Sequence, residues 1–214
     1  MFKIDSPLMN FLNKVADIMI LNALFILCCL PVFTIGASLS AAYYICYKMI
    51  RNEDSYIVKG FFKSFKDNFK QSTIVWLILM ALFVLLGMDC YILWQYAEIG
   101  KTWGSAYMVF IVMMGFAIMW AIYLFPYMAR FANTTKIVIK NTACIALLNL
   151  STTIFLFILL VAVVLMTYFF TFLIVLAPGL YMWMANYSLE KVFRKYMSEE
   201  DIAEEDERNR DYCN

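Results

Sequence analysis

The chain has 214 residues, of which 64% are hydrophobic and 15% are charged, and its formal net charge is +1. A mean hydropathy of +0.75 lies outside the range of soluble domains and indicates an integral membrane protein. The sequence has no histidine and no CxxC pair, which excludes HExxH metalloproteases, serine–histidine dyads and zinc ribbons. We therefore expect no enzyme, no cofactor and no metal centre.

The first uncharged run covers residues 18–47 and contains Pro31 and Gly36. Proline removes a backbone donor and clashes with the preceding turn, so an unbroken helix is disfavoured. The run predicts two shorter helices, over about residues 15–30 and 37–50. Two thin spans, one span and a re-entrant pair are all compatible with the residue pattern alone.

Small and hydroxyl residues follow this expected break. Gly36 and Ser40 are four residues apart, a spacing that lets two membrane helices approach closely. The alternative is a ligand site in which the Thr34 hydroxyl lies beside broken helix backbone. We expect helix packing, because small hydroxyl residues are common at contacts between membrane helices.

Residues 56–70 have the pattern of an amphipathic helix, with apolar residues on one face and lysines on its flanks and opposite side. We expect this helix to lie in the inner membrane surface, where aromatic rings enter the acyl boundary and lysines meet anionic headgroups. Docking into the groove of a partner protein is the alternative, and no nucleic-acid partner is expected. The candidate residues are Phe61, Phe62, Phe65, Phe69, Lys59, Lys63, Lys66 and Lys70.

The second and third uncharged runs are each long enough for one span of about 20 residues. They predict membrane helices over about residues 72–95 and 104–129. Asp89 is the candidate intramembrane acid, and a carboxylate in lipid often marks an ion path. We favour an interfacial position, because Asp89 lies near the outer end of its expected helix and aromatic residues follow it.

The fourth uncharged run, residues 141–189, is too long for one helix and predicts a hairpin. Its helices are expected over about residues 142–163 and 169–190, with the turn near residues 167–171. Aromatic residues in that turn suit the membrane–water boundary.

Lysine and arginine are concentrated in the connection before residue 72 and in those after residues 129 and 190, whereas the connection near Lys101 has few. The positive-inside rule therefore places both termini in the cytoplasm. This orientation predicts six membrane helices, and five crossings with an exposed N-terminus is the alternative. The expected fold is an all-α, polytopic transmembrane bundle with one interfacial helix.

The domain organisation follows from the charge distribution. Residues 1–198 are expected to form one helical membrane domain. Residues 199–214 contain eight acidic residues and two arginines, and we expect a solvated, mobile tail there.

Two segments carry a resemblance to a known family. LPVFTIGASLSAAYY from Leu30 to Tyr44 and SYIVKGFFKSFKDNFKQSTIVW from Ser55 to Trp76 are similar to the start of the YesL family of bacterial membrane proteins. That family bears a domain of unknown function and offers no functional residues to carry over. The resemblance implies a bacterial plasma membrane location and gene neighbours that encode carbohydrate transport systems.

Two functional hypotheses follow. The first is a non-catalytic accessory or regulatory component of carbohydrate ABC transport, with the lipid bilayer and permease subunits or a membrane sensor as partners. The alternative is an independent small-molecule transporter, which needs polar groups together at mid-membrane. The spans offer few such groups apart from Pro31, Thr34, Asn149, Ser151, Thr152 and Thr153.

Overall fold

The computed structural model describes residues 7–50, 56–99, 105–200 and 202–203. Within these ranges the regular structure is entirely helical, as the sequence predicts, and contains no β-strand. Four helices are long and apolar enough to cross a membrane, and they are α1, α3, α4 and α6. The predicted mobility of the acidic tail concerns residues that lie largely outside the described ranges.

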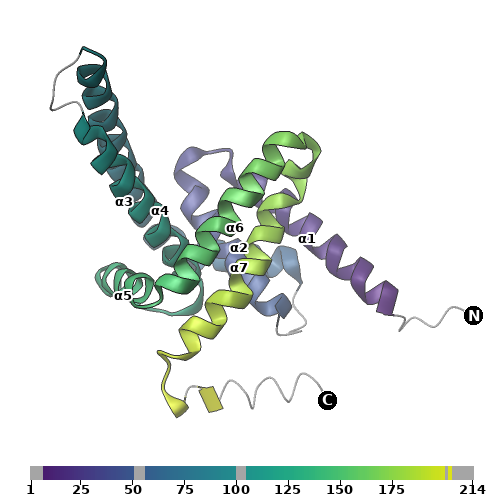
Figure 1. Ribbon diagram of the computed structural model, residues 1–214. Coiled ribbons are helices and arrows are strands. Elements are labelled where there is room, and N and C mark those ends of the chain that lie inside the picture. Colours follow the sequence, from purple (N-terminus) through teal and green to yellow (C-terminus); the bar gives the residue numbers. More distant parts are fainter. Residues whose placement is uncertain (1–6, 51–55, 100–104, 201, 204–214) are drawn as a thin grey trace, which may run out of the picture.

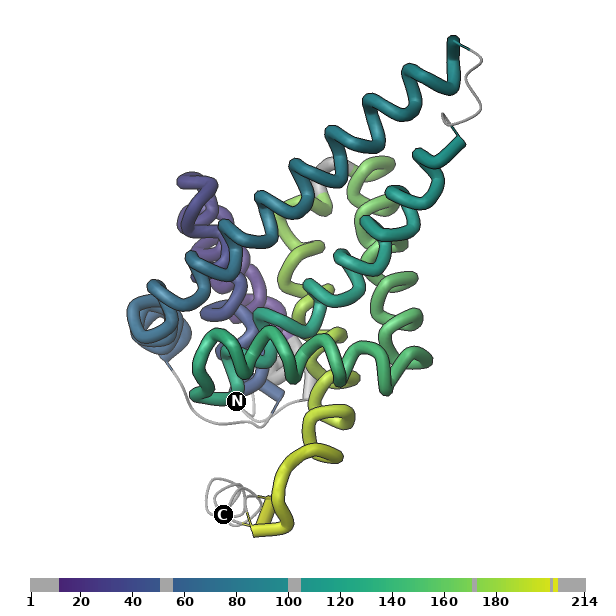
Figure 2. The backbone as a smooth tube through the Cα atoms, turned by 90° about the vertical axis from the view of Figure 1, so that its left-hand side faces the viewer, coloured from purple at the N-terminus to yellow at the C-terminus, as the bar shows by residue number. Residues whose placement is uncertain are grey.

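The helices form three hairpins in chain order. The first pairs α1 (Pro7–Cys29) with α2 (Ile35–Ile50), the second α3 (Ile57–Glu98) with α4 (Tyr107–Arg130), and the third α6 (Leu150–Phe169) with α7 (Ala177–Arg194). A further helix, α5 (Thr135–Leu148), joins the second hairpin to the third. Figure 1 shows α6 and α7 side by side in front of α2. In Figure 2 the α1–α2 turn, the end of α3 with the start of α4, and the end of α6 with the start of α7 lie toward the upper end of the molecule, and α5 lies across the lower part.

The first hairpin has its break where the proline predicts it. α1 ends at Cys29, a short 3-10 turn covers Val32–Thr34, and α2 begins at Ile35. The Thr34 hydroxyl donates to the Cys28 and Pro31 carbonyls, at 2.6 and 2.7 Å. The Pro31 carbonyl also accepts from the Thr34 N–H at 3.0 Å, so residue Thr34 binds the end of α1 and closes the turn with its side chain and its backbone.

α2 is the central helix of the bundle, since nine of its 16 residues are buried. It packs closely on α3, because a Cβ added at Gly36 would lie 2.5 Å from the Ser72 carbonyl oxygen. The Ser40 and Ser72 hydroxyls are hydrogen-bonded at 2.9 Å, and the Trp76 indole donates to the Val32 carbonyl at 2.8 Å. Small residues thus let two helix backbones approach, and hydrogen bonds join them.

α3 differs from the prediction. Separate helices were expected over residues 56–70 and 72–95, but α3 is one helix of 42 residues from Ile57 to Glu98. No proline occurs in this segment, and the helix continues without interruption through Gln71. Figure 2 shows that α3 bends, because its first part is seen nearly end-on whereas the remainder runs obliquely across the view.

The fourth run also differs from the prediction. The helix expected over residues 142–163 is two helices, α5 and α6, which meet at Asn149 with φ −116° and ψ 47°. The Asn149 amide donates to the Ile145 carbonyl at 3.0 Å and to the Tyr196 hydroxyl at 2.7 Å, which stabilises the break. The second expected helix, 169–190, begins later, because a 3-10 segment over Thr171–Val175 precedes α7.

We expect Gly36→Ala to lower the stability of the detergent-solubilised protein by about 1–3 kcal/mol, because the new methyl group overlaps the α3 backbone. The midpoint of thermal unfolding measures this effect. Gly115→Ala is the control, since a Cβ there meets no atom within 4 Å. Alanine in place of a helical glycine should stabilise by about 0.5–1 kcal/mol. Equal midpoints for the two variants would contradict the close contact.

Candidate membrane-surface site on α3

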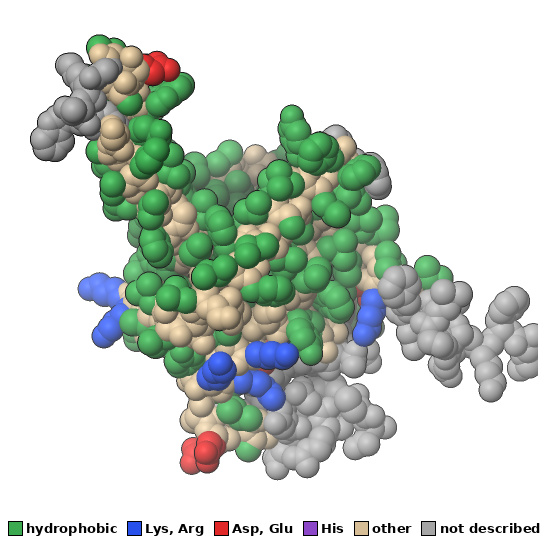
Figure 3. All heavy atoms as spheres, in the orientation of Figure 1, with side chains coloured by type: hydrophobic (Ala, Val, Ile, Leu, Met, Phe, Trp, Pro, Cys, Tyr) green, Lys and Arg blue, Asp and Glu red, His purple; other side chains and the backbone are tan. Residues whose placement is uncertain are grey.

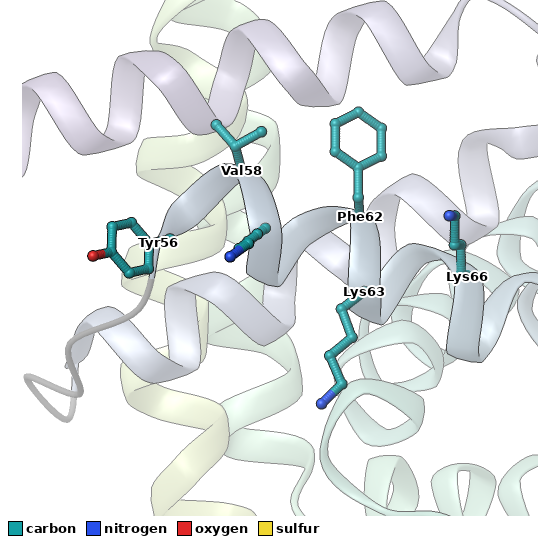
Figure 4. A pocket seen from close by; sticks show the side chains of 6 residues that line it. Tyr56, Val58, Phe62, Lys63 and Lys66 are labelled. Carbon is teal, nitrogen blue, oxygen red and sulfur yellow. The ribbon is translucent and has the colours of Figure 1, made fainter.

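The first part of α3 carries an exposed surface of cationic and apolar side chains around a shallow hollow. The hollow has a volume of about 580 Å³. Figure 4 shows Val58, Phe62 and Lys66 along one side of the helix, with Lys63 on the opposite side. We call this the basic aromatic surface, and it consists of Tyr56, Val58, Lys59, Phe62, Lys63 and Lys66.

The face of this segment that is turned away from the basic aromatic surface packs against the bundle. Phe61 is fully buried, and Ser64 is buried one turn later. A Cβ at Gly60 would lie 2.8 Å from the Ile45 Cδ1 atom, so α2 and α3 are also close at this level. Burial of this face fixes the rotation of the helix and directs the lysines outward.

The predicted apolar face is divided between the core and the surface. Phe61 lies in the core, where its ring centroid is 6.2 Å from that of Phe65. Phe65 and Phe69 are half-buried and in contact, with ring centroids 5.5 Å apart. Phe62 is 42% exposed, and Lys70 is exposed outside the hollow. The prediction that all four phenylalanines lie on the membrane surface is therefore wrong for Phe61.

The chemistry of the basic aromatic surface suits an anionic amphiphile. Lys59, Lys63 and Lys66 are exposed, and among the described lining residues none is acidic. The Lys59 ammonium lies 5.9 Å from the Tyr56 ring centroid. Phe62 and Val58 supply apolar area beside these charges. Cations next to an exposed aromatic ring are the combination with which interfacial helices bind anionic lipid surfaces.

The other predicted candidates lie elsewhere. Thr34, Gly36 and Ser40 are buried near the α2–α3 contact, whereas Pro31 is exposed in the first turn. Asp89 is exposed on the distal part of α3 and lines none of the described cavities. The structure therefore does not bring these residues together with the basic aromatic surface. Among the described residues, no group of three potential metal ligands occurs.

A buried charged cluster joins three helices, and the sequence analysis did not identify it. The Arg130 guanidinium, with an 8% exposed side chain, lies 3.1 Å from the Glu190 carboxylate. It also donates to the Tyr47 hydroxyl, and its Cζ atom is 4.2 Å from the Tyr47 ring centroid. Glu190 also pairs with Arg194 at 3.6 Å. These contacts connect α2, α4 and α7, and we assign the cluster a structural role.

We expect replacement of Lys59, Lys63 and Lys66 by glutamine to reduce the phosphatidylglycerol retained by the purified protein. Each lysine near an anionic surface contributes about 1 kcal/mol. Native mass spectrometry measures the lipid bound per protein. The control replaces the exposed Lys136, Lys140 and Lys191, which changes the net charge equally. The same loss in both variants would show that net charge alone governs lipid retention.

A comparison with known protein families gives a match over this part of the chain. A family model described as "Protein of unknown function, DUF624" matches residues 18–90. The match includes the α1–α2 hairpin from Ile18 onward, the basic aromatic surface and most of α3. No curated protein and no solved structure matches the chain. The resemblance to the YesL family is therefore confirmed, because residues 18–90 match the DUF624 domain that is found in YesL-like bacterial membrane proteins.

Proposed function

We propose that this protein is a non-catalytic accessory or regulatory subunit of a carbohydrate ABC transporter in a bacterial plasma membrane. It supports assembly or activity of the transporter and does not contact the sugar. The gene neighbours usual for YesL-like proteins motivate the choice of transporter. The observation that carries the proposal is the α3–α4 hairpin, whose distal part extends beyond the other helices (Figure 1).

The distal hairpin presents apolar surface to its surroundings. Gly87 on α3 and Gly115 on α4 each have no atom within 4 Å of an added Cβ. Packing within this chain therefore does not require glycine at either position, while glycine permits another membrane helix to approach closely. Exposed large side chains surround them, and these include Val84, Leu85, Met88, Val112, Met113 and Phe116.

The same helix joins this hairpin to the basic aromatic surface. α3 is continuous from Ile57 to Glu98, so a partner bound along the distal hairpin would be held at a fixed position relative to the lysine side chains. A permease subunit has both a membrane-embedded part and an inner membrane face. α3 would contact the membrane-embedded part of the permease subunit and lie beside its inner membrane face.

Three of the polar residues that an independent transporter could use, Thr34, Thr153 and Asn149, are engaged within the protein. Thr34 bonds to backbone carbonyls at the first turn, and Thr153 bonds to the Tyr123 hydroxyl at 3.0 Å and to the Ala146 carbonyl at 2.9 Å. Asn149 is engaged at the α5–α6 break. These bonds favour a structural role for the polar residues and support the accessory function over the transporter alternative.

The proposal includes six membrane crossings with both termini in the cytoplasm. Three hairpins with their turns at one end are compatible with this number (Figure 2). On the face seen in Figure 3, lysine and arginine side chains lie away from the distal α3–α4 hairpin. By the positive-inside rule, the lysine-bearing end is the cytoplasmic one.

Cysteine labelling tests this topology. In a background with the native cysteines replaced by serine, Lys101→Cys should react with an impermeant maleimide in intact cells. Lys66→Cys should react only in inverted vesicles, because the basic aromatic surface faces the cytoplasm. Labelling of position 66 from outside the cell would contradict the proposed orientation.

Reconstitution tests the accessory function. Liposomes containing a carbohydrate ABC transporter from the same organism should take up sugar at a changed rate when this protein is added. Gly87→Leu with Gly115→Leu should weaken co-purification of the two proteins roughly tenfold, about 1.4 kcal/mol. Ile158→Leu, at an exposed position of α6 outside the distal hairpin, is the control. Sugar uptake by liposomes containing this protein alone would refute the accessory function.

A further inference from the structure

A second cavity, with a volume of about 470 Å³, lies among α1, α2, α6 and α7. This volume is within the range of about 300–1,000 Å³ that small-molecule sites have. The buried Tyr43, Tyr181 and Met182 line it, and the half-buried Leu160 and Val163 contribute from α6. None of these residues belongs to the basic aromatic surface or to the distal α3–α4 hairpin, so the cavity is independent of the proposed function.

The described lining of this cavity carries no charged side chain. Thr167 donates to the Val163 carbonyl at 2.8 Å, so its hydroxyl is satisfied. Tyr181 is 8% exposed, and its hydroxyl lies within hydrogen-bonding reach of the Tyr43 hydroxyl, so the pair can satisfy one of its two protons internally while the other has no acceptor. A buried hydroxyl proton without an acceptor costs free energy, and a bound ligand with an oxygen acceptor removes that cost.

The mouth of the cavity opens on the lipid-facing side of the third hairpin. Val164 and Ile174 line the cavity and are exposed, and Tyr168 beside them is 81% exposed. α6 is one of the helices apolar and long enough to cross a membrane. Molecules dissolved in the bilayer therefore reach the mouth directly.

We propose that this cavity binds one acyl chain of a membrane phospholipid, with the Tyr181 hydroxyl donating to the ester carbonyl of that chain. The apolar walls suit the hydrocarbon, and the ester carbonyl supplies an acceptor for the hydroxyl proton that the Tyr43–Tyr181 pair leaves unsatisfied. A free fatty acid would bring a carboxylate into a lining that contains no described cation, at a high desolvation cost. The uncharged lining therefore selects an esterified chain over a free acid.

Photo-crosslinking tests this site in the full-length protein. The protein is reconstituted in vesicles of phosphatidylethanolamine and phosphatidylglycerol that contain phosphatidylglycerol with a diazirine on one acyl chain. After irradiation, peptide mapping should find crosslinks concentrated at residues 160–167 of α6. Val163→Trp fills the cavity and should abolish them, whereas Leu165→Trp is the control at an exposed position of the same helix that does not line the cavity.

Tyr181→Phe isolates the contribution of the hydroxyl. Loss of one net hydrogen bond should lower the crosslink yield at limiting probe by roughly 2- to 12-fold. The thermal unfolding midpoint in lipid-free detergent checks that the variant keeps its fold.

Three results would overturn the proposal. The first is an even distribution of crosslinks along α6 that Val163→Trp does not change, which indicates ordinary boundary lipid. The second is competition by free palmitate but not by phospholipid, which indicates a fatty-acid site. The third is a crosslinked second polypeptide at the cavity, which indicates that another protein covers it.

Discussion

The close approach of α2 and α3 is the contact on which the arrangement of the other helices depends. Lipid offers little hydrophobic gain when helices associate, so packing of small residues and interhelical hydrogen bonds must provide the attraction. Gly36 and Ser40 supply both where they meet Ser72, and α2 thereby becomes the central helix. α3 is continuous through this contact. The contact with α2 therefore also sets the direction of the lysine-bearing first part of α3 and of its distal half.

Much of the fold was predictable because charged residues bound the apolar runs and proline interrupts one of them. The break near Pro31 and the third hairpin follow from these local signals. The continuity of α3 was not predicted, because lysines at regular spacing mark a change of environment and not the end of a helix. Similarly, Lys136 and Lys140 limited the uncharged run, although they lie within α5. The break at Asn149 depends on Tyr196, which is 47 residues away, so no local pattern announces it.

Local sequence patterns likewise predicted part of the candidate sites, and contacts between residues far apart in the sequence determined the rest. Helical periodicity identified the lysines and phenylalanines of α3, but only the packing against α2 determines that Phe61 is buried and Phe62 exposed. Arg130 and Glu190 are 60 residues apart, and their pairing became visible only when α4 and α7 were brought together. The cavity beside Tyr181 likewise combines four helices. A tyrosine in an apolar segment does not reveal whether its hydroxyl has a partner.

The Arg130 cluster has a consequence for the order of biosynthesis. A ribosome completes α2 and α4 before α7, so Tyr47 and Arg130 exist in the chain before Glu190 does. Until α7 is synthesised, the guanidinium lacks the Glu190 carboxylate, and burial of the charge without that partner is less favourable. Arg130 should therefore stay near water and headgroups while the nascent chain is incomplete. Arrival of α7 then favours burial of Arg130, so closure of this end of the bundle follows the synthesis of α7.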